Sequence, residues 1–164
     1  MDFEIRDAGP DDAEELLAVK DQGWREAYAH LLSPEFLAAL GGDEERTERW
    51  RGILANDDGG WHFAVGCSRG RIVGMAGAGP ALDGDAPQAE EVYTVYVLAE
   101  AYGTGLAHAL VDRVIGRRAA FLWVFEDNPR AIAFYTKLGF APDGAGRVEE
   151  FDGRRLPEIR MVRR

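Results

Sequence analysis

The feature that most constrains the fold is a β-type run at residues 91–98 and the glycine-bearing turn after it. The centre of this run consists only of valine, tyrosine and threonine, which favour an extended backbone. Gly103 and Gly105 lie in the following turn, and apolar residues then recur at helical spacing over residues 106–115. A strand, a tight turn and a helix in this order predict a fold in which helices pack on a sheet.

Helical and extended patterns alternate along the rest of the chain. Before the central run, the patterns predict a strand at 2–7, three helices between residues 11 and 54, and strands at 61–67 and 71–78. After it, they predict a buried strand at 121–125, a helix at 128–138, and two strands near residue 140 and at 155–162. Strand–helix–strand units flanked by antiparallel pairs predict a mixed sheet with helices on both faces.

Length and composition fit one globular domain spanning residues 1–164. The chain has 46% apolar and 29% charged residues, which is ordinary for a folded protein. Its net charge of −10 argues against a general nucleic-acid binder, because phosphate binding needs a basic surface.

Three further absences bear on the cellular setting. No apolar run approaches the ~20 residues of a membrane span, and the N-terminus lacks a signal-peptide pattern. The single Cys67 cannot form an internal disulfide. We therefore expect a cytoplasmic protein without a membrane partner. His30, His62 and His108 show no ligand spacing, so no metal is expected.

The turn at residues 102–107 is suited to binding an anion. Glycines let a ligand approach the backbone, and the first N–H groups of a helix attract phosphate. His108 stands where a dinucleotide fingerprint needs a small residue, and the chain lacks the Gly-Lys-Ser/Thr of a P-loop. A phosphate site and a ligand-free tight turn are equally compatible with these residues.

The segment at 128–140 is the most informative in the chain. Asn128 and Pro129 suit the cap and the first position of a helix, and Gly139 suits its left-handed end. Tyr135 follows Asn128 by about two turns, so both lie on nearly one face. From physics alone, a capped amphipathic helix with a half-buried tyrosine is the favoured interpretation.

This segment resembles the Asn-x-x-Ala-x-x-Phe-Tyr-x-x-x-Gly-Phe motif of the GNAT superfamily of acyl-CoA N-acyltransferases. Upstream, residues 102–107 resemble the Gln/Arg-x-x-Gly-x-Gly/Ala pyrophosphate loop of that superfamily, with Tyr102 in place of Gln or Arg. The resemblance covers nearly the whole chain. It implies an α/β (α+β) fold with a mixed, mostly antiparallel twisted sheet of six to seven strands.

The resemblance also implies an N-acetyltransferase that moves an acetyl group from acetyl-CoA to a primary amine of a small molecule or peptide, without a metal. Tyr135 would protonate the leaving thiolate, and Asn128 would bind the arm of the coenzyme. Val95, Tyr96 and Val97 would hold the pantetheine and polarise the thioester. The pyrophosphate would lie on the remaining expected cofactor residues: Tyr102, Gly103, Thr104, Gly105, Leu106 and Ala107.

The general base is left open by the sequence. Glu91 opens the central strand where many relatives carry a catalytic glutamate, and strict alternation would place it on one face with Tyr93 and Val95. A solvated carboxylate at the strand end is an equal alternative. Glu126, at the end of the next strand, is a second candidate, and a base acting through water is a third.

The acceptor is not encoded by any motif. By resemblance, the helix that carries Trp24 and Tyr28 lines the acceptor groove together with Glu91, although these aromatic residues also suit a core. A homodimer is a family-level expectation. Two rival hypotheses are a catalytically inactive CoA-binding module and an unrelated phosphate-binding α/β protein.

Overall fold

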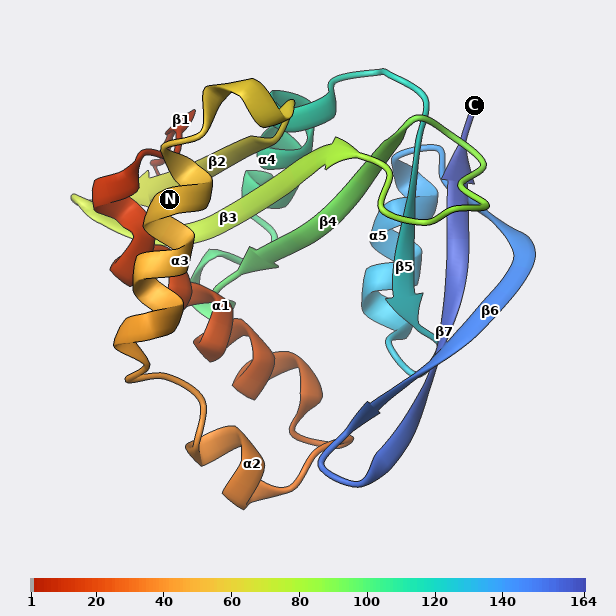
Figure 1. Cartoon of the computed structure of the whole chain (residues 1–164), viewed down its shortest axis with the longest axis horizontal. Helices are drawn as coiled ribbons and strands as arrows, with labels where there is room; N and C mark the ends of the chain where they lie inside the picture. Colours follow the sequence, from red (N-terminus) through yellow and green to blue (C-terminus); the bar gives the residue numbers. More distant parts are fainter. Residues whose placement is uncertain (1) are drawn as a thin grey trace.

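The computed structural model describes residues 2–164. Its seven strands form one sheet in the order β1-β2-β3-β4-β5-β7-β6 (Figure 1). Neighbouring strands are antiparallel except β4 and β5, which are parallel. The strands are β1 (Glu4–Asp7), β2 (His62–Ser68), β3 (Arg71–Pro80), β4 (Glu90–Val97), β5 (Ala120–Phe125), β6 (Ala141–Phe151) and β7 (Arg154–Arg163). The expectation of a mixed, mostly antiparallel sheet of six to seven strands is confirmed.

Five α-helices cover the sheet. They are α1 (Ala13–Tyr28), α2 (Pro34–Ala38), α3 (Glu44–Leu54), α4 (Leu106–Ile115) and α5 (Pro129–Lys137). In Figure 1, α1 and α3 lie in front of the sheet and α4 and α5 lie behind it, while α2 packs beside the end of α1. The prediction that helices lie on both faces of the sheet is confirmed. None of the helices in residues 2–164 is long and apolar enough to cross a membrane.

The helix ends follow the sequence. Ser33 and Asp43 cap α2 and α3 by accepting the N–H groups of Phe36 and Arg46. Asn128 caps α5 by accepting the N–H of Ala131 at 3.1 Å, and Pro129 occupies the first turn. Gly139 follows α5 with φ of +88°. The predicted cap residues of α5 are therefore confirmed.

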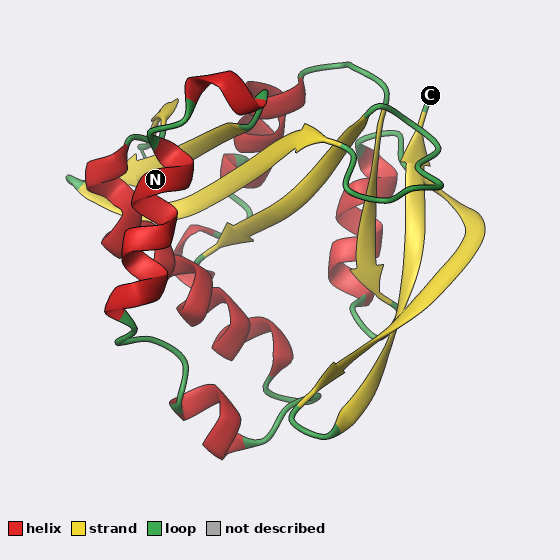
Figure 2. Ribbon diagram, in the orientation of Figure 1, coloured by secondary structure: helices red, strands yellow, loops and turns green. Residues whose placement is uncertain are grey.

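The largest core cluster joins the two halves of the sheet from behind. Leu106, Leu110 and Val114 of α4 pack against strands on both sides of the β4–β5 junction, including Val73 of β3 and Leu122 of β5. On the opposite face, the loop between β3 and β4 crosses to β5 and β7 (Figure 2). The halves are thus held together at the back and at one end.

Candidate active site

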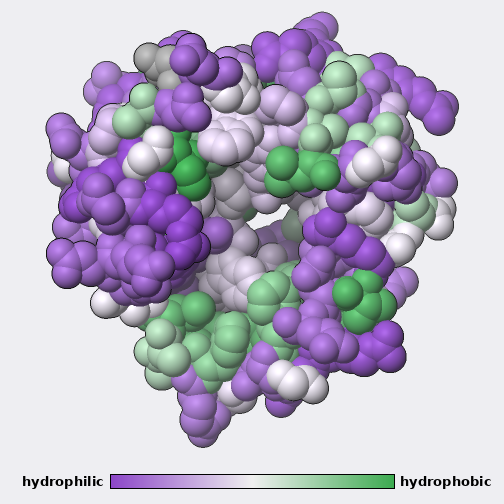
Figure 3. All heavy atoms as spheres, viewed as in Figure 1, coloured by the Kyte–Doolittle hydropathy of each residue, from purple (hydrophilic) through white to green (hydrophobic). Residues whose placement is uncertain are grey.

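The parallel strands β4 and β5 diverge almost as soon as they meet. Their only pair within residues 2–164 is Glu91 with Phe121. Beyond it β4 continues along β3, while β5 continues along β7. A cavity of about 710 Å³ lies between the diverging strands, lined by α1, β4, α4, β5, α5, β6 and β7. Figure 3 shows the molecule hollowed at its centre.

A bulge in β4 decides which side chains face the cavity. Thr94 pairs with Gly77 and Val92 with Ala78, so Tyr93 is an extra residue on β4. Val92 and Val95 consequently both pack into the core beneath α4, whereas Glu91, which precedes Val92, points to the opposite face. The expectation that Glu91 shares a face with Val95 is therefore wrong, because the bulge shifts the alternation by one residue.

The loop before α4 is open to a ligand. Gly103 and Gly105 have φ of +73° and +87°, and a Cβ at either position would meet nothing within 4 Å. Both line the cavity together with Leu106 and Ala107. Thr104, expected at the same site, instead donates its hydroxyl to the carbonyl of Ala101 at 2.7 Å and is outside the lining. The N–H groups in the first turn of α4 have no partner within the helix, and that of Leu106 lies 3.4 Å from the hydroxyl of Thr104.

A positively charged side chain lies beside this loop. The guanidinium of Arg130, in the first turn of α5, lies 3.9 Å from the ring centroid of Tyr102 and donates to its hydroxyl at 2.8 Å. Both residues line the cavity. Tyr102 occupies the position at which the resembling loops carry Gln or Arg, so the positive charge at this place comes from another element.

Tyr135 lies deeper in the same cavity, on α5. Its ring contacts Phe134 and Phe140 edge to face, with centroids 5.1 Å and 6.0 Å away. Burial, with a smaller contribution from the neighbouring Tyr28, raises the pKa of the Tyr135 phenol well above its usual value. The phenol therefore stays protonated at neutral pH and can act as a proton donor. Asn128 lines the cavity two turns earlier on the helix, as its spacing predicts.

Aromatic rings form the opposite wall of the cavity. Trp24 and Tyr28 of α1 pack edge to face with each other and with Phe125 of β5, and Trp24 also packs with Phe151 of β6. The centroid distances of these pairs run from 5.0 to 6.4 Å. The indole of Trp24 donates to the hydroxyl of Tyr96 at 2.6 Å. All five residues line the cavity, and an acceptor-binding role for Trp24 and Tyr28 stays a prediction.

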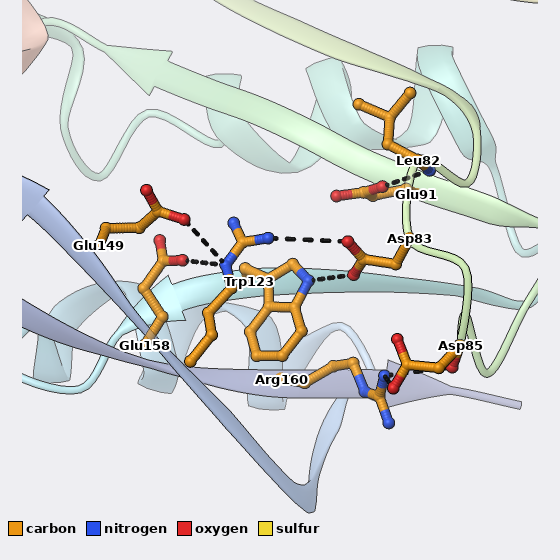
Figure 4. A network of polar contacts seen from close by, with 9 residues as sticks. Leu82, Asp83, Asp85, Glu91, Trp123, Glu149, Glu158 and Arg160 are labelled. Atoms are coloured by element: carbon orange, nitrogen blue, oxygen red, sulfur yellow. Dashed lines mark hydrogen bonds and ion pairs between the residues drawn. The ribbon is translucent and has the colours of Figure 1, made fainter.

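Charged residues of the β6–β7 hairpin complete this wall (Figure 4). Arg147 on β6 donates to Glu158 on β7 at 2.6 Å and pairs with Glu149 at 3.4 Å and with Asp83 at 3.8 Å. Its guanidinium lies 4.5 Å from the centroid of Trp123, whose indole donates to Asp83 at 2.6 Å. Three carboxylates thus surround one guanidinium.

Two of these carboxylates face the cavity together with Arg147, namely Glu149 and Glu158. Burial raises the pKa of Glu158 above its ordinary value, and Arg147 opposes that shift. A carboxyl with a raised pKa is a better proton acceptor than an exposed glutamate.

The two glutamates expected as bases lie elsewhere. Glu91 is only 7% exposed, and its carboxylate accepts the N–H of Leu82 at 3.0 Å. Burial raises its pKa, but the side chain is outside the cavity lining and holds the β3–β4 loop instead. Glu126 is exposed and also outside the lining. Either would reach a cavity ligand only through an intervening group.

Sequence reasoning missed the residues on β5, β6 and β7. Residues 141–146 contain Pro142, Gly144 and Gly146, a composition typical of a turn, yet they form the irregular start of β6. The available signal was the alternation of Arg147, Glu149 and Phe151, which predicts that these side chains share one face. No group of three or more potential ligands in residues 2–164 is arranged to hold a metal ion.

Comparison with known proteins places this geometry in a family. The Acetyltransferase (GNAT) family profile matches residues 24–140. The uncharacterized N-acetyltransferase YuaI of Bacillus subtilis (strain 168) is 25% identical, over 94% of this chain and 89% of its own length. The uncharacterized N-acetyltransferase Rv2669 of Mycobacterium tuberculosis (strain ATCC 25618 / H37Rv) is 31% identical, over 81% of this chain and 85% of its own.

A solved structure agrees on the fold. The PaiA N-acetyltransferase of Thermoplasma acidophilum, in complex with coenzyme A, superposes with a TM-score of 0.69 and 19% identity, covering 97% of this chain and 98% of that one. The family match spans the central strand, the glycine loop and the helix with Tyr135. The chain belongs to the GNAT acetyltransferase family and is an acyl-CoA-dependent N-acetyltransferase.

Proposed function

We propose that this protein transfers the acetyl group of acetyl-CoA to a primary amine of a small molecule or peptide, by direct attack within the cavity between β4 and β5. The observation that carries the proposal is that one cavity contains the open glycine loop, Tyr135 and a wall of aromatic and acidic side chains. The first can hold a diphosphate, the second a proton for the leaving group, and the third an amine.

The cavity lining fits the coenzyme. The first N–H groups of α4 and the guanidinium of Arg130 are donors for a diphosphate at the loop of Gly103 and Gly105. The edge of β4 at Val95 and Val97 faces away from β3 toward the gap, so its backbone groups are available to the amide-rich pantetheine arm. The side-chain oxygen of Asn128 accepts the N–H of Ala131 and so caps α5. The N–H groups of its side-chain amide are the donors that it can offer to the same arm.

The transfer then needs protons to leave the nitrogen and a proton to reach the departing sulfur. An alkyl ammonium has a pKa near ~10 and must lose a proton before its nitrogen can attack the thioester carbon. As the nitrogen–carbon bond forms and the carbon–sulfur bond breaks, negative charge moves to the carbonyl oxygen and then to sulfur. Backbone N–H groups of β4 stabilise the oxyanion, and Tyr135 gives its proton to the thiolate. The nitrogen loses its second proton as it becomes an amide, and this proton replaces the one that Tyr135 gave up.

We propose Glu158 as the group that takes the proton from the ammonium. It is a carboxylate that lines the cavity, and its buried position favours proton uptake. Glu91 is the alternative: its carboxylate is buried behind the β3–β4 loop, so it would need an intervening water. Glu126 would need a longer relay because it is exposed.

Paired variants test both the function and the base. Calorimetry with acetyl-CoA tests binding, and thiol release with a panel of amines tests turnover.

Because a raised pKa delays ionisation of Glu158, kcat/KM of the wild type rises as pH passes upward through that pKa, and Glu158→Gln lacks this limb. If Glu91→Gln abolishes this pH-dependent limb and Glu158→Gln does not, the general base is Glu91. Coenzyme binding without turnover of any amine would favour an inactive CoA-binding module.

A further inference from the structure

The acceptor wall of the cavity has a charge balance of its own. Arg147 contributes one positive charge, and the carboxylates of Asp83, Glu149 and Glu158 lie around it at 3.8, 3.4 and 2.6 Å. This group therefore carries an excess of negative charge inside a partly closed space. Such an arrangement attracts a further cation and repels an anion.

Arg147 is already surrounded by carboxylates of the protein. Its guanidinium stacks on Trp123 at 4.5 Å and uses its Nε–H on Glu158. A ligand carboxylate that approached Arg147 would lie close to the carboxylates of Glu149 and Glu158. Juxtaposed like charges strongly disfavour such a ligand. Nearby Arg160 is committed as well, to Asp143 at 2.8 Å and to Asp85 at 3.4 Å (Figure 4).

Flat apolar surface surrounds the same charges. Trp24, Tyr28, Phe125 and Phe151 form one edge-to-face aromatic group that borders the cavity. Aromatic walls hold flat apolar bodies and also attract ammonium groups. Thr94 adds a polar group at the wall: its hydroxyl is buried and has no hydrogen-bond partner within residues 2–164.

We propose that the acceptor is a primary amine on an aromatic or similarly flat apolar body, with no carboxylate next to the amine, and that its ammonium group docks on Glu149 and Glu158. This inference rests on the proposed acetyl transfer and narrows its substrate class. Glu149 and Glu158 together outnumber the single positive charge of Arg147 between them, so an ammonium group adds positive charge where the wall has too little.

Matched pairs of compounds test the inference. Tyramine and tyrosine, or phenethylamine and phenylalanine, differ only in the carboxylate, and putrescine serves as an aliphatic diamine. With saturating acetyl-CoA, thiol release gives kcat/KM for each. We expect tyramine to exceed tyrosine, and phenethylamine to exceed phenylalanine, by about tenfold or more. Equal or better turnover of the amino acids overturns the proposal. A tenfold preference for putrescine over tyramine overturns the requirement for an aromatic or flat apolar body.

A pair of variants ties the preference to this wall. Glu149→Gln should raise the KM for tyramine several-fold and narrow the tyramine–tyrosine ratio. Glu150→Gln removes the same charge from the next residue of β6, whose side chain is 75% exposed and pairs with Arg155, and it should change neither. Equal effects of both variants would overturn the role of Glu149.

Binding separates failure of the inference from failure of the function. Calorimetry with tyramine on the CoA-saturated protein should show heat even if turnover is slow, and no heat would overturn the inference. If acetyl-CoA itself gives no heat, the acetyl transfer fails and the substrate class fails with it. Binding of acetyl-CoA with preference for an amino acid would refute only the substrate class.

Discussion

The phenol of Tyr135 shares one cavity with the glycine loop, and its surroundings keep it protonated. Replacing it with Phe removes the proton but keeps the ring that packs on Phe134 and Phe140. We expect Tyr135→Phe to lower kcat about 100-fold, a typical contribution of a general acid. The affinity for acetyl-CoA, measured by calorimetry, should not change. Unaltered turnover would remove Tyr135 from the mechanism.

Arg130 supplies positive charge where the loop sequence itself has Tyr102. We expect Arg130→Ala to weaken CoA binding about tenfold, because a hydrogen bond from a cation to a phosphate is lost. Tyr102→Phe, which removes only the hydroxyl that Arg130 contacts, should have a smaller effect. Arg117→Ala, an equal charge loss at an exposed site after α4, is the control. If Arg130→Ala and Arg117→Ala weaken CoA binding equally, the effect is a general one of net charge and not one of Arg130 at the loop.

The residues found from sequence and those missed differ in how local their signals are. Asn128, Tyr135 and the two loop glycines belong to short segments whose spacing carries the information. Arg147 and Glu158 meet across β6 and β7, and their contact with the cavity depends on how β7 joins β5. No local pattern contains that pairing.

At the scale of elements, Gly23 brings α1 close to the central strand. A Cβ at this position would come within 2.8 Å of the Tyr96 ring. Although alanine favours helices, we expect Gly23→Ala to destabilise the protein by about 1–3 kcal/mol, since the close contact forces α1 and Tyr96 apart. Urea unfolding measures this change. The KM for the amine should also rise, because Trp24 and Tyr96 share a hydrogen bond at the acceptor wall.

Gly52, in α3, is the matched control for this substitution. A Cβ there would meet nothing within 4 Å. Gly52→Ala should therefore stabilise the protein by about 0.5–1 kcal/mol through helix propensity alone. Stabilisation by both substitutions would contradict the close contact of α1 with β4.

Element types followed from periodicity, but the bulge in β4 did not. The run at residues 91–98 has uniform strand character, and nothing in it marks Tyr93 as the extra residue. The irregularity arises where β4 pairs with Gly77 and Ala78 of β3. Since a single inserted residue reverses which side chains share a face, the direction of Glu91 could not be obtained from its own strand.

For the whole molecule, the coenzyme should act as a bridge between the two halves of the sheet. The halves share one β4–β5 pair and a core behind the gap. Acetyl-CoA at 100 times its Kd should add about 2.7 kcal/mol to the free energy of unfolding. Thermal unfolding should show this as a rise in Tm of about 5–10 °C. ATP or NAD at the same concentration should give no comparable rise, and an equal rise would indicate a general phosphate site.

The parting of β4 from β5 has a consequence for how this protein avoids self-association. Exposed strand edges are templates for pairing with other chains and hence for aggregation. Here the edges of β4 and β5 that do not pair with each other lie inside the molecule, on either side of the cavity. The outermost strands are protected differently: β1 has four residues, and β6 has Pro142 as its second residue and an irregular register after it. The unpaired N–H and C=O groups beside the cavity are thus available to a bound ligand, but they are not on an outer edge where another protein molecule could add a strand.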